Sequence, residues 1–133
     1  MRNVVFQALA EAARAGEPVA LGIITGVKGS SPQKVGAKAL FYADGRIRGT
    51  LGGGCLEAEI QHRAVQYLRT GQAAAFDLVL DHDFGWDDGL ICGGIMDIHI
   101  QSIGPGEREP FERMMGSLEQ GRRVELRIEY EQA

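Results

Sequence analysis

The sequence contains few cysteines and few prolines. Cys55 and Cys92 are the only cysteines among its 133 residues. A disulfide is not expected in a cytosolic chain this short, and two cysteines with three scattered histidines match no zinc-finger spacing. Proline contributes 4 residues, whereas glycine contributes 19. Because the glycines show no three-residue period and few prolines accompany them, collagen and a Pro/Gly linker are excluded.

Long hydrophobic runs and an excess of positive charge are also absent. No apolar run approaches the roughly 20 residues of a membrane helix, and residues 1–16 lack the apolar stretch of a signal peptide. We therefore expect a cytoplasmic protein that does not associate with membranes. The formal net charge is −4, which disfavours non-specific nucleic-acid binding. The length predicts a single domain over residues 1–133 with a substantial core.

Glycine and positive charge coincide in one third of the chain. Nine of the 19 glycines fall between Gly22 and Gly54. Residues 19–56 contain five basic side chains and one acidic side chain, a balance of +4, so the remainder carries −8. Glycine-rich backbone beside positive charge suits a small molecule that carries a phosphate. The alternative is that these residues are solvated positions of strands and turns.

The hydrophobic pattern predicts an α/β (α+β) fold. Helical spacing of apolar residues indicates helices over 2–15, 56–70 and 111–119. Apolar runs and alternation indicate strands over 19–27, 37–42, 47–51, 75–80, 95–103 and 124–130, with a hairpin turn at the Asp44-Gly45 pair. We expect a mixed β-sheet of about six strands, with about three helices packed against it.

The strongest local motif runs from Gly49 to Glu57, between a predicted strand and a predicted helix. Backbone N–H groups of its three consecutive glycines can converge on an anion, and the helix N-terminus adds partial positive charge. Cys55 would lie in the first helical turn, where a thiolate is stabilised, and Glu57 could cap the same turn. The motif is neither Walker A nor G-x-G-x-x-G. The alternative is a tight turn with a buried, inert cysteine.

Two shorter motifs have related chemistry. Residues 28–34 offer two hydroxyls, free N–H groups and two lysines, which suits oxyanion binding, although an ordinary surface turn has the same composition. Cys92-Gly-Gly94 opens the strand predicted at 95–103 and could bring a second thiol to a ligand. A free cysteine at a strand start also commonly packs in the core.

Other polar residues give weaker indications. Four aspartates and a histidine lie within residues 81–88, which could bind a hard divalent ion, but the spacing is not that of an EF-hand and such clusters are usually solvated. Trp86 in that loop could cover a planar ligand. We expect His62 on the surface and His99 as a hydrogen-bonded polar residue rather than a base. We assign no catalytic residue and no metal ligand.

Five motifs in order carry a resemblance to a known family: Gly29-Ser-Ser-Pro32, Gly36-Ala37, Asp44-Gly45, Gly49 to Glu57, and Cys92-Gly-Gly94. Together they resemble the XdhC/CoxI family, the accessory factors of xanthine dehydrogenase and related molybdenum hydroxylases. The resemblance covers residues 18–103. The Gly-Gly-Gly-Cys-x-Glu block joined to Gly-Ser-Ser-Pro carries most of its specificity.

The resemblance implies a chaperone for the molybdenum cofactor (molybdopterin) rather than a turnover enzyme. Family members bind this cofactor, support its sulfuration by a cysteine desulfurase and deliver it to the apo molybdenum hydroxylase. Glycine loops and lysines suit its phosphate, and a thiolate suits its soft metal. The matching residues expected to bind the cofactor are Gly29, Ser30, Ser31, Lys34, Gly52, Gly53, Gly54, Cys55, Glu57, Cys92, Gly93 and Gly94.

The sequence departs from the family pattern at its end. Many members continue into a C-terminal Rossmann-type domain, whereas this sequence ends at Ala133. We expect residues 105–130 to close the single domain with a helix and a strand. A separate Rossmann-type subunit or a homodimer is then the expected partner.

Two other functions remain open. One is an enzyme that acts on a phosphorylated or nucleotide substrate, with the glycine loop as an oxyanion cradle and Cys55 as nucleophile, although no general base is evident. The other is a structural or interaction domain, which the retention of every motif makes the least favoured of the three.

Overall fold

The structure is a computed structural model. It describes residues 4–28, 34–52, 54–71, 73–79, 95–104 and 108–125, and for residues 54–56, 73–79 and 108 it describes the backbone only. Its elements in chain order are α1 (Val4–Ala15), β1 (Val19–Lys28), β2 (Lys38–Tyr42), β3 (Ile47–Gly49), α2 (Gly54–Thr70), β4 (Ala73–Val79), β5 (Ile95–Ile103) and α3 (Arg108–Glu119).

The described strands form one sheet of five, in the order β3-β2-β1-β5-β4. Every neighbouring pair in it is antiparallel. The predicted α+β class and three helices are confirmed, whereas the expected mixed sheet of about six strands is wrong for the described residues, which form five strands, all antiparallel. Hydrophobic alternation marks a strand but does not set its direction or its neighbour, since both depend on pairing between distant segments.

The first two residues of the strand predicted at 124–130 are not in a strand. Val124 and Glu125 belong to no strand, and they line a hollow against α3 together with Phe111 and Met114. Residues 126–130 lie outside the described residues. The alternation of apolar side chains around Val124 predicts a strand, but its first two residues are exposed and border a hollow beside a helix.

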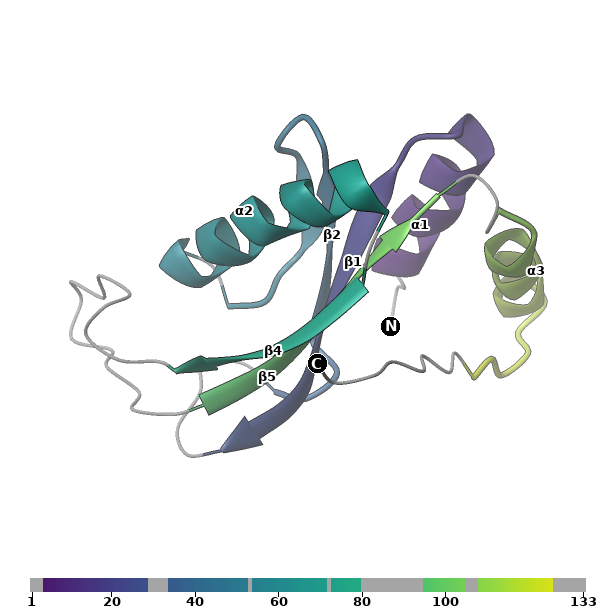
Figure 1. The fold of residues 1–133 in the computed structure, drawn as a ribbon. Helices are drawn as coiled ribbons and strands as arrows, with labels where there is room; N and C mark the ends of the chain where they lie inside the picture. The colour runs from purple at the N-terminus through teal and green to yellow at the C-terminus, as the bar shows by residue number, and fades with distance from the viewer. Residues whose placement is uncertain are drawn as a thin grey trace.

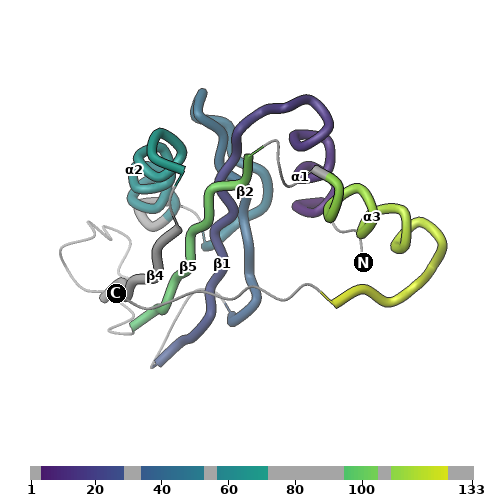
Figure 2. Tube along the Cα trace, turned by 45° about the vertical axis from the view of Figure 1, so that its right-hand side comes forward, coloured from purple at the N-terminus to yellow at the C-terminus, as the bar shows by residue number. Residues whose placement is uncertain are grey.

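The sheet lies between two helical layers. α2 covers one face, and α1 with α3 covers the other (Figures 1 and 2). Alternate residues of the central strand β1 supply both cores: Val19 and Leu21 pack with α1 and α3, and Ala20 and Ile24 pack with α2. This two-sided burial explains why β1 reads as a continuous apolar run.

The structure confirms the predicted hairpin turn and the predicted helix near residues 111–119. In the β2–β3 turn the Gly45 N–H donates to the Tyr42 carbonyl oxygen at 3.1 Å, and the Tyr42 N–H donates to the Arg46 carbonyl oxygen at 3.0 Å. Gly45 has a φ of 97° there, which explains the glycine of the Asp-Gly pair. The helix predicted at 111–119 starts one turn earlier, with Pro110 in its first turn, where a missing N–H costs nothing.

Candidate functional site

Residues that flank two of the predicted ligand segments, 29–33 and 92–94, lie together at one end of the sheet. Lys28, the last residue of β1, is paired with Ile95, the first of β5, and Ile95 is also paired with Val79, the last of β4. β3 points toward the same end, and α2 starts on that side (Figure 1). Loop 29–33 and segment 92–94 therefore attach at this end, whereas β3 ends at Gly49, opposite Ala39 and level with Gly22 of β1, and loop 50–53 leads from there to α2.

The loop between β3 and α2 is organised around the carboxylate of Glu57. This residue lies in the first turn of α2, as predicted. Its Oε1 accepts a hydrogen bond from the Thr50 hydroxyl at 2.6 Å and another from the Leu51 N–H at 2.9 Å. The Gly52 N–H in turn donates to Thr50 Oγ1 at 3.1 Å. The carboxylate thus binds the loop that precedes its helix.

Thr50 is not among the residues that the sequence motifs predict for the site. The Ser/Thr-to-Glu spacing of a capping box is three residues, whereas Thr50 and Glu57 are seven apart, so that pattern could not find the pair. The only available signal was a hydroxyl residue inside a glycine-rich turn that is followed by an acidic first helical turn. That signal is too common to be selective on its own.

The structure describes only some of the predicted ligand residues. Gly54 and Cys55 are the first two residues of α2, so Cys55 lies in the first helical turn as predicted. Gly52 has a φ of 121°, and Lys34 is exposed. Seven others lie outside the described residues: Gly29, Ser30, Ser31, Gly53, Cys92, Gly93 and Gly94. The acidic segment 81–88, with Trp86, lies outside them too.

The cations of the glycine-rich third do not form one patch. Lys38 Nζ lies 5.2 Å from the centroid of the Phe6 ring of α1, on the face of the sheet opposite α2. Arg46 binds Glu17 at 2.7 Å and Asp44 at 2.8 Å. The backbone N–H of Arg46 and then its guanidinium lower the pKa of Asp44. Lys28 is the last residue of β1, at the sheet end described above, and Lys34 follows in the connection to β2; both are exposed.

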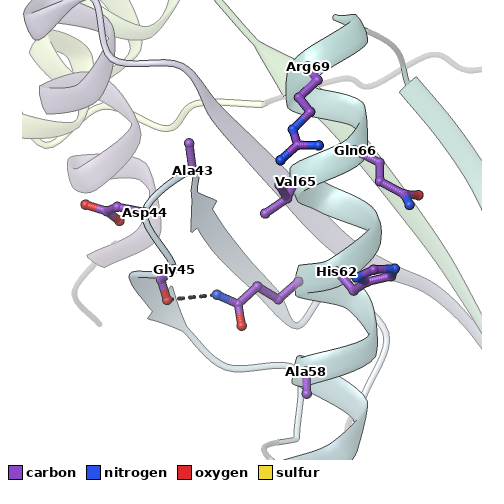
Figure 3. A pocket seen from close by; sticks show the side chains of 9 residues that line it. Ala43, Asp44, Gly45, Ala58, His62, Val65, Gln66 and Arg69 are labelled. Carbon is purple, nitrogen blue, oxygen red and sulfur yellow. Dashed lines mark hydrogen bonds between the residues drawn. The ribbon is translucent and has the colours of Figure 1, made fainter.

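A hollow of about 490 Å³ lies elsewhere, between the β2–β3 turn and the outer side of α2. In Figure 3 the side chains of Val65 and Arg69 extend toward the turn, and those of His62 and Gln66 extend away from it. Gln61 Nε2 donates to the Gly45 carbonyl oxygen at 2.9 Å across the hollow. None of the predicted ligand residues lines it, and His62 is exposed as expected.

His99 lies within the sheet. It is 1% exposed, and its Nε2 is 3.3 Å from Gln101 Oε1. Burial lowers the pKa of His99, and the contact with Gln101 offsets part of that effect. Its register partner is Ile23, on the face opposite α2. His99 is therefore a buried, hydrogen-bonded residue, as the sequence favoured.

The described part of the chain holds neither a membrane span nor a metal cluster. No helix in it is long and apolar enough to cross a membrane. No group of three or more His, Cys, Asp and Glu side chains in the same ranges is arranged to hold a metal ion. The acidic segment 81–88 is outside these ranges, so its predicted alternatives stay open.

Comparison with known proteins gives related chains. The chain is 32% identical over 117 residues to a Bacillus subtilis protein described as a probable xanthine dehydrogenase subunit, covering 86% of this chain and 36% of that protein. It is 25% identical over 130 residues to the molybdenum cofactor insertion chaperone PaoD of Escherichia coli, covering 96% and 39% respectively. It thus spans little more than a third of the length of either relative.

A solved structure and a family profile agree with these relatives. The crystal structure described as a xanthine dehydrogenase from Bacillus halodurans superposes with a TM-score of 0.76 at 28% identity, over 87% of this chain and 35% of that one. Residues 12–81, more than half of this chain, match the profile of the XdhC and CoxI family. This chain therefore belongs to the XdhC and CoxI family.

Proposed function

We propose that this chain is an accessory protein of a molybdenum hydroxylase, which binds the molybdenum cofactor and passes it to the apo-enzyme. Family membership supports this proposal, as does the similarity to a relative described as a molybdenum cofactor insertion chaperone. The observation that carries it is the organised Thr50–Glu57 loop, which leads directly into α2, the helix that starts on the side of the sheet where the other family motifs attach.

The chemistry of this end suits the cofactor. The first N–H groups of the 17-residue helix α2 have no partner within the helix, and the helix dipole adds partial positive charge. Both features favour the cofactor's phosphate, and the exposed Lys28 and Lys34 add full charges on the same side. The cofactor would supply a soft metal, for which a thiolate at Cys55 or Cys92 is a suitable neighbour.

Several residues would hold the cofactor under this proposal. Backbone N–H groups of the glycine segments and the hydroxyls of Ser30 and Ser31 would bind its oxyanions. The ammonium group of Lys34 would offset the negative charge of the cofactor's phosphate. The thiols of Cys55 and Cys92 would lie near its metal. The residues proposed to hold or border the cofactor are Gly29, Ser30, Ser31, Lys34, Gly52, Gly53, Gly54, Cys55, Cys92, Gly93 and Gly94.

The partners follow from the same proposal. A carrier needs an apo molybdenum hydroxylase as acceptor, and a cysteine desulfurase if the cofactor is sulfurated while bound. We also propose a separate Rossmann-type subunit or a second copy of the chain as a partner. Co-purification of these proteins with the tagged chain tests each partner separately.

Co-purification of the cofactor tests the central claim. The chain is expressed with a source of molybdenum cofactor, and the bound pterin is oxidised and measured by fluorescence. We expect pterin on the wild-type chain, and a loss of about tenfold or more in Cys55→Ala, Cys92→Ala and Lys34→Ala. Arg69→Ala, which removes an exposed cation at the Figure 3 hollow, is the matched control and should retain the pterin.

Two results together would reject the proposal. One is the absence of pterin from the wild-type chain, and the other is undiminished activation of the hydroxylase by both cysteine variants. A thiol-nucleophile enzyme is less well supported, because His99 lies on the sheet face opposite α2 and His62 is exposed on the outer surface of that helix, at the hollow. Neither of these two histidines offers a base to the first turn of α2.

A further inference from the structure

We infer that Glu57 is a positioning residue for the proposed cofactor site: its carboxylate holds residues 50–52 in place and is not itself a ligand. This inference rests on the proposed function, and it changes the role that the sequence suggested for Glu57. The reason is that its Oε1 is already engaged twice, by the Thr50 hydroxyl at 2.6 Å and by the Leu51 N–H at 2.9 Å.

The three hydrogen bonds form a connected chain. Gly52 N–H donates to Thr50 Oγ1, the Thr50 hydroxyl donates to Glu57 Oε1, and Leu51 N–H donates to the same oxygen. Bonds to an ionised acceptor are about twice as strong as bonds between neutral groups. Because the Leu51 and Gly52 N–H groups both point into this chain, they are used internally. Neither of these two N–H groups is then available to an anion, so under this inference the Gly52 backbone borders the cofactor without donating to it.

The loop is anchored by packing at Leu51 and at Gly49, where it leaves β3. Leu51 is 0% exposed and belongs to the core under α2, with Phe41 and Ile60. A Cβ at Gly49 would lie 2.6 Å from the Lys38 carbonyl oxygen, so the backbone of β3 leaves the sheet in close contact with β2. Glu57 connects these anchors to the first turn of α2. Without this carboxylate, only the adjacent residues of the chain would fix the positions of Thr50 and Gly52.

A direct ligand and a positioning residue respond differently to the loss of charge. Glutamine keeps a side-chain oxygen that can accept from Thr50 and Leu51 but has no charge, whereas alanine loses the acceptor. A residue that acts through hydrogen bonds to the loop is therefore largely rescued by glutamine. Glu59→Gln is the matched control, because Glu59 lies on the same helix and pairs with Arg63 at 3.0 Å rather than with the loop.

The experiment measures two quantities on the full chain and its variants. Amide hydrogen exchange, followed by NMR, reports the Leu51 and Gly52 N–H groups, and fluorescence of the oxidised pterin reports the bound cofactor. We expect Glu57→Ala to raise both exchange rates about tenfold or more and to lower pterin content about tenfold. Glu57→Gln should stay within about threefold of wild type in both, and Glu59→Gln should match wild type.

Three outcomes would overturn the inference. The first is wild-type exchange in Glu57→Ala, and the second is faster exchange with unchanged pterin content. The third is a loss of pterin in Glu57→Gln while the amides stay protected, which would make Glu57 a ligand through its charge. If the wild-type chain itself carries no pterin, the proposed function fails, and the exchange rates alone still decide whether Glu57 holds the loop.

A second pair of variants covers the case in which Glu57→Ala does not fold. Thr50→Val keeps the side-chain shape but removes the donor to Glu57 and the acceptor of the Gly52 N–H. Thr50→Ser keeps the hydroxyl. We expect faster Gly52 exchange and less pterin in Thr50→Val, and wild-type values in Thr50→Ser. Equal behaviour of the two variants would contradict the inference.

Discussion

Gly49 occupies the point where β3 gives way to the loop that leads into α2. Its φ is 86°, a value that residues with a side chain rarely adopt. A Cβ there would lie 2.6 Å from both the Lys38 carbonyl oxygen and Val5 Cγ2. The valine side chain can move, but the β2 backbone cannot move without disturbing its pairing.

Substitution of Gly49 should therefore destabilise the fold. We expect Gly49→Ala to lower the free energy of unfolding by about 2–4 kcal/mol, from backbone strain and steric overlap together. Urea unfolding followed by circular dichroism measures the change. Gly104→Ala is the control, since a Cβ there meets nothing within 4 Å. A change below about 1 kcal/mol in Gly49→Ala would show that the strand exit is not tightly constrained.

His99 should make the stability depend on pH. Burial lowers its pKa from the usual 6.5, so the unfolded chain takes up the proton first as the pH falls. Between the folded and unfolded pKa values the free energy of unfolding then decreases by up to about 1.4 kcal/mol per pH unit.

The expected result is a loss of wild-type stability from about pH 7 downward that is smaller in His99→Gln. Urea unfolding at a series of pH values between about 7.5 and 5.5 measures it. His62→Gln, which changes an exposed histidine, serves as the control variant. An unchanged dependence in His99→Gln would mean that other groups cause it.

At the scale of the element, glycine has opposite effects in two helices. Gly71 follows the last residue of α2 with a φ of 69° and donates its N–H to the Tyr67 carbonyl oxygen at 2.8 Å, as the terminating glycine of a helix does. Gly116 lies inside α3, and its φ is not positive. A Cβ meets nothing within 4 Å at either position.

The same substitution should consequently change stability in opposite directions. Gly71→Ala should lower the free energy of unfolding by about 1 kcal/mol, because alanine is strained at positive φ. Gly116→Ala should raise it by about 0.5–1 kcal/mol, because alanine favours the helix interior. Thermal unfolding of the two variants side by side checks both signs. A stabilising Gly71→Ala would argue against the left-handed helix end.

At the scale of the whole molecule, the sheet joins two cores into one cooperative unit. Leu9 of α1 and Ile60 of α2 are each 0% exposed and lie in different clusters on opposite faces of the sheet. Both clusters share β1 and β2, whose alternate residues point into each. Neither core can come apart without exposing one face of the same strands.

This arrangement predicts additive losses within a single transition. Leu9→Ala and Ile60→Ala should each cost about 2–5 kcal/mol. The double variant should cost their sum within about 0.5 kcal/mol, since the two side chains belong to separate clusters. Urea unfolding followed by far-UV circular dichroism and by tyrosine fluorescence should give coincident transitions for each single variant. Separate transitions from the two probes would show that the helical layers unfold independently.

The sequence alone determined the features that depend on neighbours along the chain. These are the extent of α1, the two-sided apolar run of β1, the Asp44-Gly45 turn, the end of α2 at Gly71 and the place of Cys55 in its first turn. Each follows from spacing or from the backbone preference of one residue type. The order of motifs also sufficed to indicate the family.

Only the tertiary structure decided how distant segments meet. The antiparallel order of five strands, the pairing of Lys28 with Ile95, the stacking of Lys38 on Phe6 and the use of Glu57 by Thr50 and Leu51 all join residues whose separation no local pattern encodes. Val124 shows the same limit, because its alternation fits a strand, whereas it belongs to no strand and lines a hollow beside α3. Periodicity reports which side of a residue is apolar, and packing decides what covers that side.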